Sequence, residues 1–195
     1  MDGIILINKE KNCTSHDVVY KVKKIFKEKV GHTGTLDPNA TGVLPILVGK
    51  GTKMSKYLIN HDKIYVVTLK LGQRTDTQDS EGKIIEEKEV AKDVLNKENI
   101  INILKKFIGK SSQIPPIYSA IKVNGKKLYE YARRGEYVEI KPREIQIYNI
   151  NLNKIDAKNN EIIFEVGCSK GTYIRSLCED IAKAIGTVRI YERTK

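Results

Sequence analysis

The sequence predicts an α+β fold built on a mixed, mainly antiparallel sheet with flanking helices. Two observations indicate this class. Strand-like and helix-like segments are interspersed along the chain, and they do not follow the strict strand–helix–strand alternation of a parallel sheet. The chain has 195 residues, of which 40% are hydrophobic and 30% charged, which suits one globular domain with a substantial core. We therefore expect a single domain over residues 1–195.

Three segments carry the apolar periodicity of amphipathic helices. The first is expected to begin at Thr14 or Ser15, either of which can cap it, and to run to about Lys29 with valines on one face and lysines largely on the other. The second is expected over about 91–108 and the third over 173–185. Each of these is followed by a glycine that suits a helix end.

Strands are predicted where β-branched and apolar runs are bounded by turn residues. These runs are Ile4–Ile7, Ile64–Leu71, Ile84–Val90, Ile117–Val123, Arg143–Leu152 and Glu161–Cys168. The segment Gly42–Val48 is short and apolar and is expected to be buried. The dipeptide Asn124-Gly125 predicts a tight hairpin, and a short helical turn is expected over Leu128–Arg134.

The net charge of +11 is unevenly distributed. Residues 1–60 carry ten lysines and five acidic residues, and residues 101–145 carry ten basic and four acidic residues. Between them, residues 61–100 carry seven basic and nine acidic residues. Two basic blocks around an acidic one favour a polyanionic partner such as nucleic acid or an anionic membrane. A lysine-rich composition without function explains the same numbers equally well.

The remaining composition excludes several classes of protein. Three widely spaced cysteines without a CxxC pair indicate a reducing compartment, and we expect a cytoplasmic protein. The start lacks the pattern of a signal peptide, and no apolar run approaches the ~20 residues of a membrane span. The three histidines and three cysteines show no metal-ligand spacing, so no metal site is expected.

The densest signal for chemistry is the loop between Gly31 and Pro45. Its glycines permit unusual backbone conformations, and Pro38 pushes Asp37 toward an extended geometry. Threonines in the loop can hydrogen-bond it to itself. Such a segment can present one carboxylate rigidly between two structured elements. On generic grounds alone, a tight turn in which Asp37 caps a neighbouring group is the stronger alternative.

Five runs in the same order resemble the TruB family of tRNA pseudouridine synthases. The resemblance extends from about residue 2 to residue 186 and includes the loop that carries Asp37. The runs are GHTGTLDPNATGVLPILVGKGTK, DKIYVVTLKLG, GQRTDTQDSEG, QIPPIYSAIKVNGKKLYEYAR and CSKGTYIRSL. The resemblance implies the pseudouridine synthase fold and an isomerase that needs no cofactor. Its expected substrate is the uridine numbered 55 in the T-arm loop of tRNA.

The resemblance also implies roles for individual residues. Asp37 corresponds to the catalytic carboxylate, and Arg175 corresponds to the arginine that pairs with it. Tyr65 corresponds to the aromatic residue that stacks on the target base and is counted with the catalytic group. Tyr173 corresponds to a second aromatic residue of the base pocket. His32 resembles the residue that occupies the space left by a flipped nucleotide.

Lys9 completes the expected substrate-binding set, and it begins a run that resembles the family's KxxGxTS motif. Here the sequence departs from the family, because Asn12 stands where the family usually has glycine. Asparagine tolerates a left-handed conformation better than most residues, so the turn is expected to survive.

The resemblance also implies a thumb-like insertion over about 113–143, which is expected to lie over the RNA. Individually, its basic residues read as ordinary surface charges, but as a cluster with several tyrosines they favour RNA contact. The residues expected to contact the RNA backbone are Lys122, Lys126, Lys127, Arg133, Arg134, Lys141 and Arg143.

Three alternatives stay open beside a tRNA pseudouridine synthase that acts as a monomer without an obligatory protein partner. The first is a guide-RNA-dependent pseudouridine synthase, and the second is a non-catalytic chaperone that folds tRNA. The third is a generic basic binding protein. After Gly186 the resemblance weakens, and the PUA-type RNA-binding module that the family often adds is not expected in these 195 residues.

Overall fold

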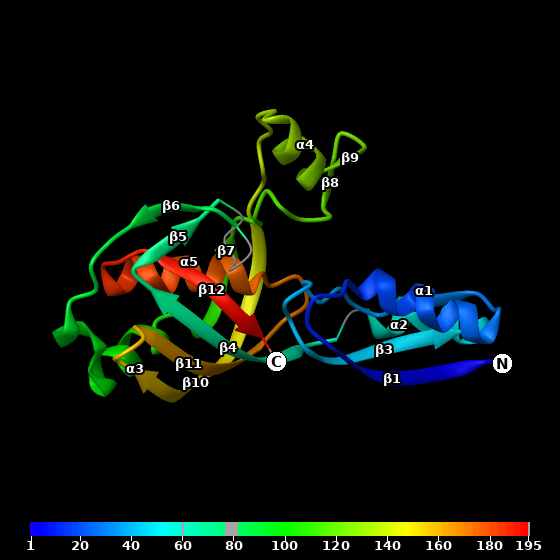
Figure 1. Ribbon diagram of the computed structural model, residues 1–195, viewed down its shortest axis with the longest axis horizontal. Coiled ribbons are helices and arrows are strands. Elements are labelled where there is room, and N and C mark those ends of the chain that lie inside the picture. The colour runs from blue at the N-terminus through cyan, green and yellow to red at the C-terminus, as the bar shows by residue number, and fades with distance from the viewer. Residues whose placement is uncertain (60, 77–81, 195) are drawn as a thin grey trace. The chain divides into compact units, whose positions relative to one another are not determined.

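The computed structural model describes residues 1–59, 61–76 and 82–194 and confirms the α+β class (Figure 1). It comprises two compact units. The first unit is Met1–Val66 together with Arg193–Lys195, and the second is Val67–Glu192.

The first unit is a three-stranded antiparallel sheet covered by one helix. The strand order is β1-β3-β2, and Ile5 of β1 lies opposite Ile46 of β3. Helix α1 packs its valines onto one face of this sheet, against side chains such as Leu44 and Ile46, which are fully buried. The elements are β1 (Gly3–Lys9), α1 (Ser15–Phe26), β2 (Val30–His32), β3 (Gly42–Val48), the 3-10 helix η1 (Gly49–Met54) and α2 (Ser55–Leu58).

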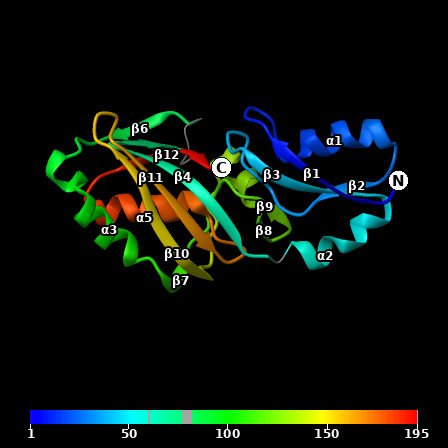
Figure 2. The ribbon, with the colours of Figure 1, turned by 90° about the horizontal axis from the view of Figure 1, so that it is seen from below.

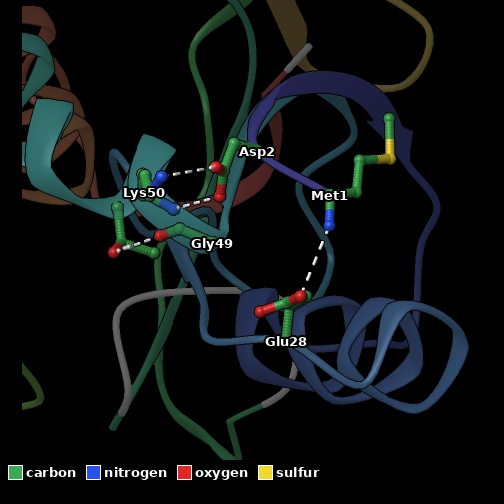
Figure 3. Close-up of polar contacts among 6 residues, drawn as sticks. Met1, Asp2, Glu28, Gly49 and Lys50 are labelled. Atoms are coloured by element: carbon green, nitrogen blue, oxygen red, sulfur yellow. Dashed lines mark hydrogen bonds and ion pairs between the residues drawn. The ribbon is translucent and has the colours of Figure 1, made fainter.

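The first two residues of the chain bond the segments that follow α1 and β3. The amino group of Met1 lies 3.3 Å from the carboxylate of Glu28 (Figure 3). The carboxylate of Asp2 accepts a hydrogen bond of 2.6 Å from the backbone N–H of Lys50. Gly49 has φ 58°, and a Cβ there would collide with the Asp2 carboxylate, so this connection requires glycine.

Helix α1 begins with a capping box, as its sequence allows. The Thr14 hydroxyl accepts from the Asp17 N–H at 3.1 Å, and the Asp17 carboxylate accepts from the Thr14 N–H at 2.8 Å. The hydrogen bond from the Thr14 side chain is the main reason why the pKa of Asp17 is lowered from its ordinary value. The cap fixes where α1 starts, and Ser15 at this start bonds the loop that carries Asp37.

The second unit is organised around a five-stranded sheet of order β12-β4-β11-β10-β7. Helix α3 contacts both β10 and α5, and Figure 2 shows the two helices beside this sheet. The β10–β11 pair is antiparallel and places Leu152 opposite Phe164. Its elements are α3 (Lys97–Lys105), β7 (Gly109–Gln113), β10 (Arg143–Asp156), β11 (Glu161–Cys168) and α5 (Ile174–Ile185). The strands β4 (Lys63–Leu71) and β12 (Arg189–Thr194) also belong to this sheet, and the unit boundaries after Val66 and before Arg193 fall within them.

The thumb-like insertion leaves and rejoins this sheet at one point. Gln113, the last residue of β7, is the register partner of Arg143, the first residue of β10. The segment between them holds a small hairpin and helix α4, which project from the sheet in Figure 1. Its elements are β8 (Lys122–Val123), β9 (Lys126–Lys127) and α4 (Leu128–Arg134). Asn124 and Gly125, with φ values of 50° and 83°, form the predicted tight turn.

Several element boundaries differ from the prediction. The single helix expected over 91–108 is a 3-10 helix η2 (Lys92–Leu95) followed by α3, because the side chain of Asn96 accepts from the Asn99 N–H and starts a new helix. The strand expected over 117–123 is only the two-residue β8. The strand expected over 84–90 is β6 (Ile84–Glu87), paired with β5 (Gln73–Thr75). Residues 77–81 of the expected polar turn lie outside the described residues.

Candidate active site

The loop that carries Asp37 is anchored by a buried lysine. The Lys9 side chain is only 1% exposed, and its ammonium donates to three main-chain carbonyls. The distances are 2.9 Å to Glu10, 2.8 Å to Cys13 and 3.0 Å to Pro38. A buried ammonium is tolerated only where such partners satisfy its donors. Lys9, expected in the substrate-binding set, thus directs its charge inward to the carbonyl that follows Asp37.

A second clamp holds the residue before Asp37. The Ser15 hydroxyl accepts from the Leu36 N–H at 2.9 Å and donates to the Leu36 carbonyl at 3.3 Å. Ser15 is 1% exposed and is the first residue of α1, so the helix start and the loop are fixed together. The Ala40 N–H donates to the Asp37 carbonyl at 3.0 Å and closes a turn beyond it. Asp37 itself is half-buried between these clamps.

Asn12 takes the left-handed conformation that the family resemblance required of this position. Its φ is 61°, a value that most non-glycine residues avoid. Its backbone N–H donates to the Pro38 carbonyl at 3.1 Å, beside the Lys9 ammonium. The substitution of asparagine for glycine therefore preserves both the turn and its bond to the Asp37 loop.

His32 ends strand β2 just before the loop. His32 lies opposite Ile46 of β3 in the register. The next residue, Thr33, donates its N–H to the Pro45 carbonyl at 3.3 Å. The His32 Nδ1 atom is buried and has no hydrogen-bond partner within the described residues. Buried polar atoms are normally paired, so this nitrogen is an uncommon feature beside a candidate site.

Tyr65, the aromatic residue expected to stack on the target base, is half-buried on the first half of β4.

The second unit brings Tyr173 and Arg175 together at the start of α5. Tyr173 is the cap residue and Arg175 lies in the first turn, where its side chain is 8% exposed. One guanidinium nitrogen of Arg175 donates to the Tyr118 carbonyl at 3.0 Å. Arg175 is therefore a buried cation and not an ordinary surface arginine. Burying a charge is costly unless the charge is paired or hydrogen-bonded, so its place in the fold is specific.

Two residues that the sequence prediction did not single out hold this second group. The side chain of Gln113 bonds the main chain of Tyr173, and the Ser176 hydroxyl donates to the Ile114 carbonyl at 3.0 Å. Gln113 is 5% exposed and Ser176 is 9% exposed. Gln113 lies in the run QIPPIYSA, and Ser176 lies in the run CSKGTYIRSL. Neither the residue types nor their spacing predicts which residues these two side chains bond.

The thumb presents cations and tyrosines together. Lys127 and Arg133 each lie 5.3 Å from the ring centre of Tyr129, and Lys126 lies 5.8 Å from that of Tyr131. Tyr137 is 93% exposed. Of the seven basic residues expected to contact RNA, Lys127 is half-buried and the other six are exposed. Six of the cations are therefore available to a polyanion, and the charged groups of Lys126, Lys127 and Arg133 lie over tyrosine rings.

Other kinds of site find little support in residues 1–59, 61–76 and 82–194. No three His, Cys, Asp or Glu side chains in these ranges gather into a group that could hold a metal ion. Cys13, Cys168 and Cys178 are free thiols. No helix in the same ranges combines the length and apolar content needed to cross a membrane.

Comparisons with known sequences point to one family. The profile described as "TruB family pseudouridylate synthase (N terminal domain)" matches residues 23–174. A tRNA pseudouridine synthase B of Oceanobacillus iheyensis is 52% identical over 187 residues, which is 95% of this chain and 61% of that protein. One of Clostridium tetani is 50% identical over 199 residues, which covers 100% of this chain and 68% of that protein.

Solved structures agree on the fold. A chain of a Cbf5-Nop10-Gar1 complex matches 99% of this chain and 48% of its own length, with a TM-score of 0.73 and 32% identity. A chain from an H/ACA RNP bound to a substrate RNA containing 2'-deoxyuridine matches with a TM-score of 0.68 and 28% identity over 99% of this chain and 46% of its own length. The family profile covers well over half of the residues, and relatives about half identical span nearly all of them; the chain thus belongs to the TruB family of pseudouridylate synthases.

Proposed function

We propose that this chain isomerises uridine to pseudouridine in tRNA, at position 55 of the T-arm loop, with Asp37 as the catalytic carboxylate. The observation that carries the proposal is the loop of Asp37, which is clamped at Leu36 by Ser15 and at Pro38 by Lys9. Relatives named tRNA pseudouridine synthase B supply the substrate class. The chain spans only 61% of the first of these relatives, so the activity of the whole protein is part of the proposal.

The chemistry suits a single fixed carboxylate. The bond between N1 of uracil and C1′ of ribose breaks, the base turns, and C5 bonds to C1′ while N1 gains a proton and C5 loses one. All heavy atoms are retained, so the balance includes no oxidant or reductant. A carboxylate serves as nucleophile or as stabiliser of developing positive charge on the sugar. Clamping its main chain on both sides limits the reorganisation needed during the reaction.

Other residues take roles from the resemblance. Tyr65 and Tyr173 offer aromatic faces for the uracil, and a phenol can also assist the transfer of the C5 proton. Arg175 is assigned to pair with the catalytic carboxylate, on the resemblance alone. His32 is assigned to the space left by the extruded nucleotide, and its buried unpaired Nδ1 supports a role in which RNA supplies a partner.

The thumb is proposed to hold the RNA backbone. Its exposed lysines and arginines supply phosphate contacts, and its tyrosines supply surfaces on which unstacked bases can lie. We further propose that both units act as one catalytic domain, that the chain works as a monomer without an obligatory protein partner, and that it does so in the cytoplasm.

A guide-RNA-dependent pseudouridine synthase is the second candidate. Its support is the fold similarity to the chain of the Cbf5-Nop10-Gar1 complex. Sequence identity favours the first proposal, because the relatives named tRNA pseudouridine synthase B reach 52% against 32% for that chain.

One experiment separates the candidates. The purified 195-residue chain is incubated with an unmodified tRNA transcript, without guide RNA or other protein, and pseudouridine is mapped by chemical labelling and primer extension. A single new site at position 55 of the T-arm loop is the expected result. Product that appears only when a guide RNA is added would support the second candidate. Tight tRNA binding without product under either condition would contradict both and favour a chaperone.

A further inference from the structure

Gln113 forms an unusual two-bond contact with the main chain of Tyr173. The Tyr173 N–H donates to the Gln113 amide oxygen at 2.8 Å, and the Gln113 amide nitrogen donates to the Tyr173 carbonyl at 3.1 Å. Gln113 is 5% exposed, and 60 residues separate the partners. A side-chain amide here imitates the paired donor and acceptor of a neighbouring strand.

The contact gives the Tyr173 N–H its acceptor and adds a second donor to the Tyr173 carbonyl, which also accepts from the Leu177 N–H at 3.1 Å. Tyr173 caps α5, and no side chain of its own helix start caps the first turn. Helix N-termini leave backbone N–H groups that need external acceptors. The amide presents one donor and one acceptor in this geometry at every pH, whereas an ionised carboxylate cannot donate and an apolar side chain can do neither.

The same contact lies where the thumb leaves the sheet. Gln113 is the last residue of β7 and pairs in register with Arg143, at which the chain returns. The next residues of the insertion are also bonded to α5, since Ser176 donates to the Ile114 carbonyl and Arg175 to the Tyr118 carbonyl. Four hydrogen bonds therefore join residues 113–118 to residues 173–176.

We propose that Gln113 is a positioning residue for the pseudouridylation reaction. It fixes the main chain at Tyr173, and through it the direction of the Tyr173 ring and of the Arg175 guanidinium two residues later. Because it also anchors the neck of the thumb, it fixes the thumb relative to Tyr173 and Arg175 within the second unit. This inference rests on the proposed function, in which Tyr173 and Arg175 contact the target uridine or the catalytic carboxylate.

The kinetic consequence follows from this placement. The Gln113 amide bonds the main chain of Tyr173, and when it is lost the bonds from Ser176 to Ile114 and from Arg175 to Tyr118 still hold the neck of the thumb, so the phosphate contacts are expected to stay in place. A small misplacement of reacting groups is enough to cost about 100-fold in rate. Gln113→Glu and Gln113→Met are therefore expected to lower kcat by about 10- to 100-fold while KM for tRNA changes by less than about threefold.

The Gln113→Glu variant also predicts a specific pH dependence of kcat. At neutral pH its carboxylate accepts from the Tyr173 N–H but repels the Tyr173 carbonyl. Protonation restores one donor and one acceptor on a side chain of the same shape. Burial beside a carbonyl raises the pKa of such a carboxyl above its ordinary value of about 4.3. The ratio of mutant to wild-type kcat is thus expected to rise as pH falls from about 8 to about 5.5.

Gln146→Glu is the matched control, since Gln146 is half-buried on the adjoining strand β10 and its main chain, rather than its amide, bonds Ser169. Retained kcat at all pH values in both Gln113 variants, with wild-type active, would overturn the inference. An inactive wild type would instead refute the proposed function. Exchange of the Tyr173 amide hydrogen then decides on Gln113: faster exchange in Gln113→Met supports it, and unchanged exchange overturns it.

Discussion

Replacement of Lys9 by methionine tests whether the lysine anchors the loop of Asp37. The variant keeps most of the aliphatic stem and removes an ammonium that donates to three carbonyls. Hydrogen bonds from a charged group contribute about 1.5–3 kcal/mol each, but burying the ammonium offsets part of that. Two of the carbonyls also keep other donors, the Asn12 N–H at Pro38 and the Cys13 thiol at Glu10. We expect a net loss of about 2–4 kcal/mol in the free energy of unfolding.

Urea denaturation followed by circular dichroism measures this loss. With a slope near 2 kcal/mol per molar urea, the midpoint should fall by about 1–2 M. Lys11→Met is the control, because Lys11 lies two residues away and is exposed, and its midpoint should stay within about 0.3 M of the wild type. A Lys9→Met midpoint equal to that of the control would show that the three bonds do not stabilise the loop and would refute the reasoning.

Three further changes probe the turn, the carboxylate and the thumb. Asn12→Ala should lower the free energy of unfolding by about 1 kcal/mol, because a φ of 61° is strained for alanine. Asn12→Gly should not lower it, and urea midpoints measure both changes. Asp37→Asn should abolish pseudouridine formation in single-turnover assays and leave the tRNA Kd within about threefold, and a variant with wild-type turnover would exclude Asp37 as the catalytic group. Lys122→Gln combined with Lys126→Gln should reduce the slope of log Kd for tRNA against log salt by about 2, while Lys97→Gln on α3 should not change it; equal slopes would argue against thumb–phosphate contact.

The sequence predicted the regular elements best where their periodicity is strong. Strand β11 has the predicted bounds Glu161–Cys168, and the apolar face of α1 is the one its valines indicate. Strand β7 was missed because its residues, Gly109–Gln113, are polar and show no alternation. Its strand conformation comes from pairing with β10, a tertiary contact that local sequence does not encode.

The contacts that build the candidate site were less predictable than its residue types. Lys9 reaches Pro38 across 29 residues, Ser15 reaches Leu36 across 21, and Gln113 reaches Tyr173 across 60. No spacing rule links positions so far apart. The resemblance drew attention to Asp37, Tyr173 and Arg175, and their roles stay predictions. It did not indicate that Ser15 and Gln113 hold the main chain beside them.

These three contacts share a property that bears on how the site tolerates change. In each, a buried polar side chain bonds main-chain atoms of a segment that carries a proposed site residue, and main-chain atoms are the same for nearly every residue type. Substitution at the held positions, such as Leu36, therefore leaves the bonding groups in place. Substitution at Lys9, Ser15 or Gln113 removes these bonds, and main-chain groups such as the Leu36 N–H and the Tyr173 N–H then lose the side-chain partner that they have here. The geometry of the proposed reacting groups thus depends most on Ser15 and Gln113, which were not assigned to the RNA, and on Lys9, whose ammonium bonds the main chain.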